Sequence, residues 1–278
     1  MTQPHTAGAP PHHESFRDRP TLVFLHAHPD DEASSTSGTI ARAVRDGHRV
    51  VVVFATNGDH GEPAHDLAEG ETVVDRRRKE AAASGAALGV QRIEWLGYAD
   101  SGMTGWAQND AEHAFGKADV DEAAHQLLRI LDEEDAEVLI GYDWHGTYGH
   151  PDHVQVHHVA HRAAELAHRK PRMLEVTINR DAMRAMMANT PEEQRWDVDG
   201  PADDGNPVGT PEAEIQWDVD VSTYLAQKRA SMQSHISQTS DIGMMLGMTP
   251  EVFASAFGHE YYLEPGRIAP LTARWPLD

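Results

Sequence analysis

The 278-residue sequence contains no cysteine. This absence excludes disulfide bonds, zinc sites built from thiolates and catalytic cysteines, so any metal ion must be held by nitrogen and oxygen ligands. Basic residues are also few, because 23 Lys and Arg stand against 45 Asp and Glu, for a formal net charge of −22. Such a charge repels phosphate backbones and anionic lipids, so we expect neither nucleic acid nor a membrane as a partner.

Long apolar segments are missing as well. There is no run of 18 apolar residues, and residues 1–20 lack the apolar centre of a signal peptide, so we expect a soluble cytoplasmic protein. Residues 1–19 are rich in proline and histidine and are expected to form a mobile tail. Residues 20–278 are long enough to form a single domain with a large core. The sequence does not indicate an oligomeric state.

Strand-like and helix-like segments alternate along the chain. Apolar, β-branched runs typical of buried strands lie at 22–25, 48–55, 90–96, 136–141 and 173–178. Helical periodicity is found at 39–45, 72–88, 119–134 and 154–168. The alternation predicts an α/β fold with a doubly wound, mostly parallel, Rossmann-like sheet. Beyond it, residues 190–210 are rich in Pro, Gly and Asp and predict a surface excursion within a smaller irregular C-terminal portion.

A cluster of ionisable side chains directly follows the first predicted strand. The segment His26-Ala27-His28-Pro29-Asp30-Asp31-Glu32 places two imidazoles and three carboxylates on one strand-to-helix turn. Open α/β sheets bind ligands at such turns, and these charges would be costly to desolvate without a cation. The segment therefore indicates a metal site. The alternative is a solvated acidic loop in which Asp30 or Asp31 caps the next helix.

A second cluster, residues 142–153, follows the fourth predicted strand and contains several histidines. One of them, with His28 and Asp31, could bind a divalent ion and leave a position open for water, as in catalytic zinc sites. Asp30 could then take a proton from that water, and His150 and Tyr148 could stabilise an oxyanion.

The sequence leaves open whether His145 or His157 contributes to this site. We interpret His157, His158 and His161 mainly as packing or surface residues of the following helix, because a catalytic metal usually takes three protein ligands.

The two motifs, His28-Pro29-Asp30-Asp31-Glu32 and His150-Pro151-Asp152-His153, closely resemble the two signatures of the LmbE/PIG-L family of metal-dependent N-deacetylases. The likeness extends from about Leu22 to Val159 and resumes more weakly at Lys228 to Gln238 and at His259-Glu260-Tyr261-Tyr262. It is greatest to the actinobacterial branch that includes the mycothiol-pathway deacetylase and the mycothiol conjugate amidase. The resemblance implies a Rossmann-like hydrolase that uses zinc, or ferrous iron as the other candidate metal, on a small N-acetylglucosaminyl compound.

The resemblance also implies roles for individual residues. The implied metal ligands are His28, Asp31 and His153. The implied catalytic residues are Asp30 as general base, His150 to stabilise the oxyanion or protonate the leaving amine, Asp152 to orient a histidine, and Tyr148 to polarise the amide carbonyl. The implied contacts to substrate hydroxyls are Arg77 and Asp100.

Other functions compete with this interpretation. An amide of a thiol conjugate is the second substrate class, and an antibiotic intermediate is the third. A non-haem iron oxygenase also uses two histidines and one carboxylate, although we expect antiparallel β-sandwiches for those enzymes. A non-catalytic metal-binding or ligand-binding domain is the last alternative, but structural metal sites are normally closed by four protein ligands.

Overall fold

The structure is a computed structural model that describes residues 19–62, 66–268 and 270–277. The expected tail at 1–19 therefore falls outside the described residues, apart from Arg19. Within the described ranges, no helix is both long enough and apolar enough to cross a membrane.

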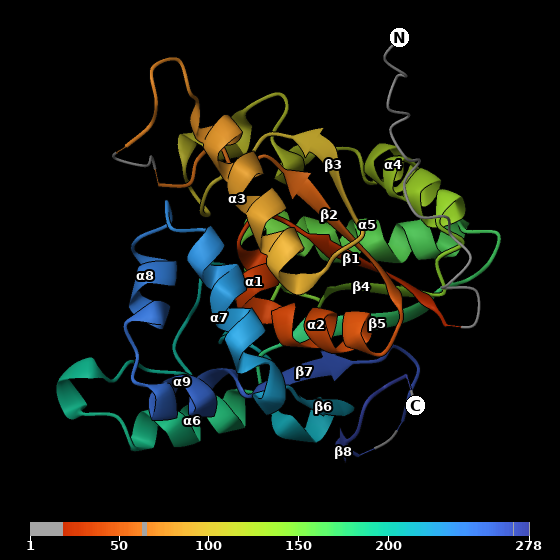
Figure 1. Ribbon diagram of the computed structural model, residues 1–278. Coiled ribbons are helices and arrows are strands. Elements are labelled where there is room, and N and C mark those ends of the chain that lie inside the picture. Colours follow the sequence, from red (N-terminus) through yellow and green to blue (C-terminus); the bar gives the residue numbers. More distant parts are fainter. Residues whose placement is uncertain (1–18, 63–65, 269, 278) are drawn as a thin grey trace, which may run out of the picture.

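One eight-stranded mixed sheet forms the centre of the molecule, with strand order β3-β2-β1-β4-β5-β7-β6-β8 (Figure 1). The strands are β1 (Thr21–His26), β2 (Arg49–Thr56), β3 (Arg92–Tyr98), β4 (Val138–Tyr142), β5 (Arg172–Thr177), β6 (Trp217–Asp220), β7 (His259–Leu263) and β8 (Thr272–Ala273). Strands β1 to β5 are parallel, and β7 pairs antiparallel with both β5 and β6. The strand order reverses at β1, and ligands of doubly wound folds bind at that switch point, beyond the carboxyl ends of the strands.

Helices cover both faces of the sheet, as expected for right-handed crossovers between parallel strands. The helices are α1 (Asp31–Ser35), α2 (Ser37–Arg45), α3 (Val73–Leu88), α4 (Val120–Glu133), α5 (Pro151–Leu166), α6 (Arg180–Ala188), α7 (Leu225–Ser234), α8 (Asp241–Leu246) and α9 (Pro250–Phe257). Helices α4 and α5 pack together against one face, whereas α2, α3 and α7 pack together on the other (Figure 1). The predicted doubly wound, mostly parallel α/β fold is confirmed.

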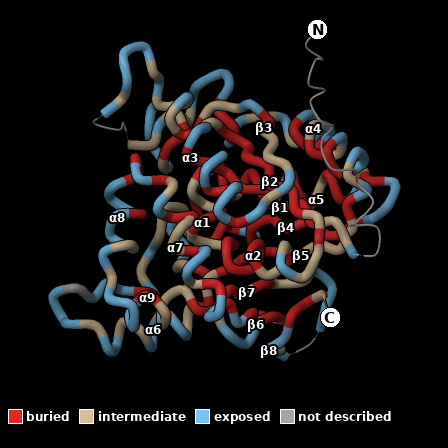
Figure 2. Tube along the Cα trace, in the orientation of Figure 1, coloured by how far each residue is buried: buried red, intermediate tan, exposed pale blue. Residues whose placement is uncertain are grey.

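The core lies along the central strands, which are buried in Figure 2. Every residue of β4 is buried, and only the first residue of β1 and of β2 is partly exposed. This burial on both faces explains why these strands are continuous apolar runs rather than alternating ones. The edges of the sheet and the outer helices carry the exposed surface.

Two element boundaries near the predicted site differ from the sequence prediction. The helix predicted at 39–45 is preceded by α1, which begins inside the first motif at Asp31. Helix α5 begins at Pro151 rather than at 154, because the His150 side chain accepts a hydrogen bond from the Asp152 N–H and caps the helix. Both motifs therefore sit on the first turns of helices, where backbone N–H groups favour negative charge.

Candidate active site

The two motifs meet at the switch point of the sheet. His28 and Asp31 follow β1, His153 lies on the first turn of α5 after β4, and β1 pairs directly with β4. The structure brings these three side chains into one group whose ligand atoms all lie within 4.8 Å of one another. The cluster is buried or nearly so, although its members are far apart in the sequence.

Asp31 lies midway between the two histidines. Its Oδ2 atom is 3.4 Å from His28 Nδ1 and 3.4 Å from His153 Nε2. Two ligand atoms bound to a tetrahedral zinc ion at the usual distances lie about 3.4 Å apart. The donor set therefore fits one divalent ion held by two imidazoles and a carboxylate.

Hydrogen bonds fix the orientation of both imidazoles. His28 Nε2 is 3.1 Å from Asp152 Oδ2, and His153 Nδ1 is 3.2 Å from the carbonyl oxygen of Gly146. An N–H at each of these atoms leaves the opposite ring nitrogen with a free lone pair, and both free nitrogens face Asp31. Metal-binding histidines are commonly held by a carboxylate or a carbonyl in this way.

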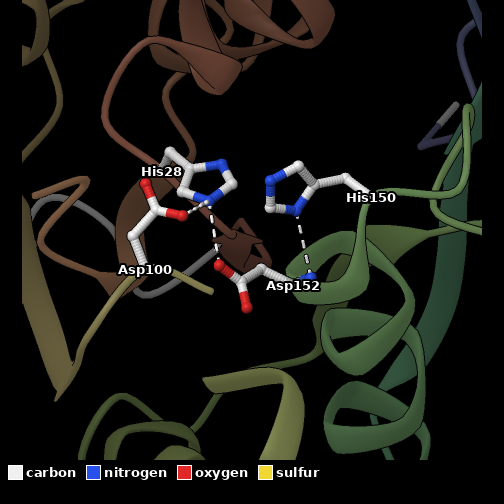
Figure 3. A group of neighbouring side chains, drawn as sticks. All are labelled: His28, Asp100, His150 and Asp152. Atoms are coloured by element: carbon white, nitrogen blue, oxygen red, sulfur yellow. Dashed lines mark hydrogen bonds and ion pairs between the residues drawn. The ribbon is translucent and has the colours of Figure 1, made fainter. Parts of the chain in front are cut away.

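Figure 3 shows a second group that could also hold an ion: His28, Asp100, His150 and Asp152. Here His28 Nε2 points at the carboxylates of Asp100 and Asp152, at 3.5 and 3.1 Å. The Asp152 carboxylate also accepts hydrogen bonds from the Ser101 N–H, at 2.9 Å, and from its hydroxyl, at 2.5 Å. These donors already occupy the Asp152 carboxylate, which also holds the imidazole of His28 in its orientation.

Asp30 has an unusual backbone and a buried partner. Its φ of 109° lies in the left-handed region that non-glycine residues rarely adopt, and such strain is common at functional sites. Its carboxylate is 3.0 Å from Arg77 Nη2. Burial, helped by the charge of Asp31, raises the pKa of Asp30 to about 6, although Arg77 opposes this shift. The carboxylate therefore titrates close to neutral pH, which suits a general base.

Arg77, from α3, is almost completely buried. Besides Asp30, its guanidinium donates to the carbonyl oxygens of Pro29 and Gly58. A Cβ atom at Gly58 would lie 2.4 Å from the guanidinium, and one at Gly61 would lie 2.3 Å from it. The glycines of the loop after β2 thus make room for the arginine that contacts Asp30.

His150 and Tyr148 lie close to the group formed by His28, Asp31 and His153. Burial, with the nearby His28 and His153, lowers the pKa of His150 to about 3. The neutral ring accepts the Asp152 N–H at Nδ1, at 3.1 Å, so its own proton is on Nε2. The Tyr148 hydroxyl is 3.4 Å from His153 Nε2, and burial raises the pKa of Tyr148 well above its usual value. Both side chains can therefore donate a hydrogen bond at neutral pH.

The loop between β4 and α5 has its own supports. Asp143 is fully buried and accepts hydrogen bonds from the Thr147 N–H, at 2.7 Å, and the Thr177 hydroxyl, at 2.5 Å. Gly146 has a φ of +64°, and a Cβ atom there would lie 2.3 Å from the Cβ of His153. The loop can therefore pass close to His153 only with glycine at this position.

Residues 190–210 pack against the same loop. Main-chain N–H groups of Asp203 and Gly209 donate to the carbonyl oxygens of Tyr148 and Thr147, at 3.0 and 2.6 Å. Thr210, at the end of the segment, is buried. This part of the chain therefore supports the side of the site formed by the β4–α5 loop.

The two histidines that the sequence left open lie outside the group formed by His28, Asp31 and His153. His145 is buried and points toward Asp204 and the carbonyl oxygen of Gly209. His157 is one turn further along α5 and contacts Glu175 on β5. Neither belongs to either ligand group around His28.

Sequence reasoning missed two buried ion pairs that support the site. Glu32 accepts a hydrogen bond from Asp30 N–H, at 2.9 Å, and pairs with His235 at 2.6 Å. Glu260 pairs with Lys228 at 2.6 Å and also accepts the Gly38 N–H at the start of α2. The partners lie far apart in the sequence, so a single sequence gives no signal of these pairings.

Comparisons with known proteins agree on one family. Residues 23–164 match the PIG-L family, described as GlcNAc-PI de-N-acetylase. The chain is 36% identical over 247 residues to 1D-myo-inositol 2-acetamido-2-deoxy-alpha-D-glucopyranoside deacetylase of Saccharomonospora viridis, covering 85% of this chain and 89% of that protein.

Solved structures share the fold at lower sequence identity. N,N'-diacetylchitobiose deacetylase from Pyrococcus horikoshii aligns with a TM-score of 0.54 and 22% identity, over 91% of this chain and 85% of its own. The 4-carboxy-2-hydroxymuconate hydratase from Pseudomonas putida aligns with a TM-score of 0.54 and 17% identity, over 92% of this chain and 100% of the hydratase chain. Because a hydratase has this fold too, the fold alone does not determine the reaction, which depends on the residues of the site.

Proposed function

This chain belongs to the PIG-L family, and on this basis we propose that it is a metal-dependent hydrolase that removes the N-acetyl group of an N-acetylglucosaminyl inositol. Its family and its relatives make it an N-deacetylase of N-acetylglucosamine-type substrates. The specific substrate, the metal and the residue roles are our proposal. The observation that carries it is the position of Asp31 Oδ2, 3.4 Å from one nitrogen of each of two oriented imidazoles.

We propose His28, Asp31 and His153 as the metal ligands. They comprise two neutral donors and one anionic donor, which is a common protein ligand set for catalytic zinc, and ferrous iron is the other candidate. A zinc or ferrous ion bound there would lower the pKa of a bound water and polarise the amide carbonyl.

The remaining residues of the site have complementary roles in amide hydrolysis. Asp30 accepts a proton as the water oxygen attacks the amide carbon. The Tyr148 hydroxyl and the Nε2–H of His150 donate hydrogen bonds to the developing oxyanion. When the C–N bond breaks, Asp30 returns the proton to the amine nitrogen, and the products are acetate and a free amine.

His150 is better suited to donate a hydrogen bond than to act as the acid. Its ring is neutral with the proton on Nε2, so giving up that proton would leave an imidazolate anion. Asp152 holds His28, as described above, and thereby acts as a positioning residue. Binding of substrate hydroxyls by Arg77 and Asp100 stays a prediction.

The test is acetate release from 1D-myo-inositol 2-acetamido-2-deoxy-alpha-D-glucopyranoside by the full chain. We expect activity that a chelator abolishes and that stoichiometric zinc or ferrous iron restores. Amides of thiol conjugates serve as the comparison substrates. Faster cleavage of those amides would reassign the substrate, and activity that persists after complete metal removal would overturn the metal-dependent proposal.

A further inference from the structure

A further group of side chains that could bind a metal ion lies outside the active site, between α5 and β5. His157 and His161 are one turn apart on α5, and Glu175 is on β5. Their ligand atoms lie within 4.8 Å of one another. None of the three belongs to the groups around His28, and the proposed deacetylation does not use them.

Helix α5 packs closely on strands β4 and β5 next to these three side chains. Glu175 is in register with Gly141 on the neighbouring strand β4. A Cβ atom at Gly141 would lie 3.1 Å from the Cβ of Ala160, so the glycine lets α5 pack closely on the sheet. This close packing places the turn from His157 to His161 directly over the Glu175 carboxylate.

One oxygen of Glu175 contacts both imidazoles. Glu175 Oε1 is 3.2 Å from His157 Nδ1 and 2.5 Å from His161 Nε2, and the two rings are 4.3 Å apart between centroids. Glu175 is only 7% exposed. Within the part of the chain that the structure describes, this carboxylate has no Lys or Arg partner. A buried carboxylate needs a compensating positive charge. Burial alone would lower the pKa of His157, but the hydrogen bond and the charge of Glu175 raise it above the ordinary value of 6.5. A divalent cation bound between the same side chains would supply this charge in place of the imidazole proton.

We propose that His157, His161 and Glu175 form a second site for a divalent cation, with zinc as the best-suited ion. Two histidines at i and i+4 on a helix, with a carboxylate beside them, are a ligand set that suits zinc. His157 Nδ1 is also 3.1 Å from the carbonyl oxygen of Tyr142, so a main-chain oxygen helps to fix the orientation of this imidazole next to Glu175. The His161 side chain is 34% exposed, so the ion can enter from solvent and complete its coordination with water.

This site adjoins the active site through two shared elements. His153 precedes His157 by one turn on α5. The Tyr142 ring stacks on His153 at 4.6 Å, while its carbonyl oxygen contacts His157. An ion bound at the second site would therefore lie next to the elements that hold a proposed ligand of the first.

The experiment is a zinc titration of the full-length, metal-stripped chain by calorimetry, followed by metal analysis after desalting. We expect the wild type to bind one more zinc equivalent than His161→Ala or Glu175→Gln. Removing a ligand should weaken this site at least as much as removing a supporting group, by ~10–100-fold or more. His158→Ala is the matched control, because His158 is exposed on the same helix and belongs to none of the three candidate ligand groups. This variant should bind as much zinc as the wild type does.

A second comparison separates this proposal from the proposed function. His28→Ala should lose the zinc of the active site and keep the zinc equivalent that depends on His161. Binding of this remaining zinc should raise the Tm of the variant. That rise should be absent from the double variant His28→Ala/His161→Ala. If wild type and His161→Ala bind the same number of zinc ions with the same affinity, the three residues form only a hydrogen-bonded network and the second site does not exist.

Discussion

The carboxylate of Asp30, whose side chain is 21% exposed, lies 3.0 Å from the guanidinium of the buried Arg77, beside the proposed metal ligands. Neither residue belongs to the group of proposed metal ligands, His28, Asp31 and His153. The proposed general base, Asp30, is therefore distinct from the proposed metal ligands. Substitutions can test the two roles independently.

Asp30→Asn should keep its metal and lose most of its activity. The amide preserves the size of the side chain but cannot accept the proton of the attacking water, so we expect kcat to fall by ~10²–10⁴-fold, the usual contribution of a general base. Metal analysis and acetate release should be measured on the same preparation. Loss of the ion from this variant would identify Asp30 as a ligand instead.

His153→Ala should lose the ion of the active site. It removes one of three proposed ligands, whereas Asp152→Asn removes a charge that only orients His28 and should weaken binding by ~10–100-fold. Competition with a zinc chelator of known affinity distinguishes the two effects. Unchanged metal affinity in His153→Ala would point to the group formed by His28, Asp100, His150 and Asp152 as the true ligand set.

Gly146→Ala should disturb both stability and metal binding. The new Cβ would have to fit 2.3 Å from the Cβ of His153, at a φ of +64°. Gly205 is a matched control, because its φ is +86° and nothing lies within 4 Å of the point that a Cβ atom would occupy there. Gly205→Ala should therefore cost only the backbone strain, about 1 kcal/mol, and keep full metal affinity. Denaturant unfolding and metal titration of the two variants measure the difference, and equal behaviour would show that the loop moves freely away from His153.

Glu134 should make stability depend on pH in acid. Burial alone would raise the pKa of Glu134, but hydrogen bonds from Arg49 and Arg92 hold it below its ordinary value of 4.5. The stabilisation is therefore fully present above pH 4.5 and is lost as the pH falls toward the lower pKa of the folded state. Glu134→Gln should be less stable than wild type by roughly 1–3 kcal/mol at pH 7, and this difference should shrink at pH 3. A constant difference at both pH values would mean that the charge of Glu134 does not contribute.

Lys228→Met should be strongly destabilising, by roughly 3–5 kcal/mol, because it leaves the Glu260 carboxylate buried without its cation. The double variant Lys228→Met/Glu260→Gln removes both charges and should recover part of the loss. Urea unfolding of the wild type, Lys228→Met, Glu260→Gln and the double variant gives the coupling energy between the two residues. Additive effects would show that the 2.6 Å contact stabilises little.

The sequence predicted the parts of the molecule that local pattern determines. Apolar runs followed by ionisable residues located the ends of β1 and β4, and alternation with helices placed both ends at one edge of the sheet. The antiparallel strand β7 could not be foreseen, since its pairing with β5 depends on contacts across a long sequence separation. The buried pair of Lys228 and Glu260 was missed for the same reason: each residue alone looks like ordinary surface charge.

In the site, too, the sequence predicted what local motifs determine and missed what depends on contacts between distant segments. The motifs named the candidate ligands, but not which nitrogen of each imidazole faces Asp31. That depends on Asp152 and on the Gly146 carbonyl oxygen, whose positions follow from the fold of the β4–α5 loop. Likewise, the contact of Arg77 with Asp30 depends on how α3 packs against the first motif.

The segment containing Asp203 and Gly209 is joined to the β4–α5 loop by main-chain atoms, through the carbonyl oxygens of Tyr148 and Thr147. These bonds do not use the side chain of Asp203, whereas Gly209 has to remain glycine, because its φ is +62° and a Cβ atom there would lie 2.1 Å from the carbonyl oxygen of Ile178. Side chains of this segment that do not contact the β4–α5 loop can therefore change without breaking the main-chain bonds that hold Tyr148 and Thr147 in place.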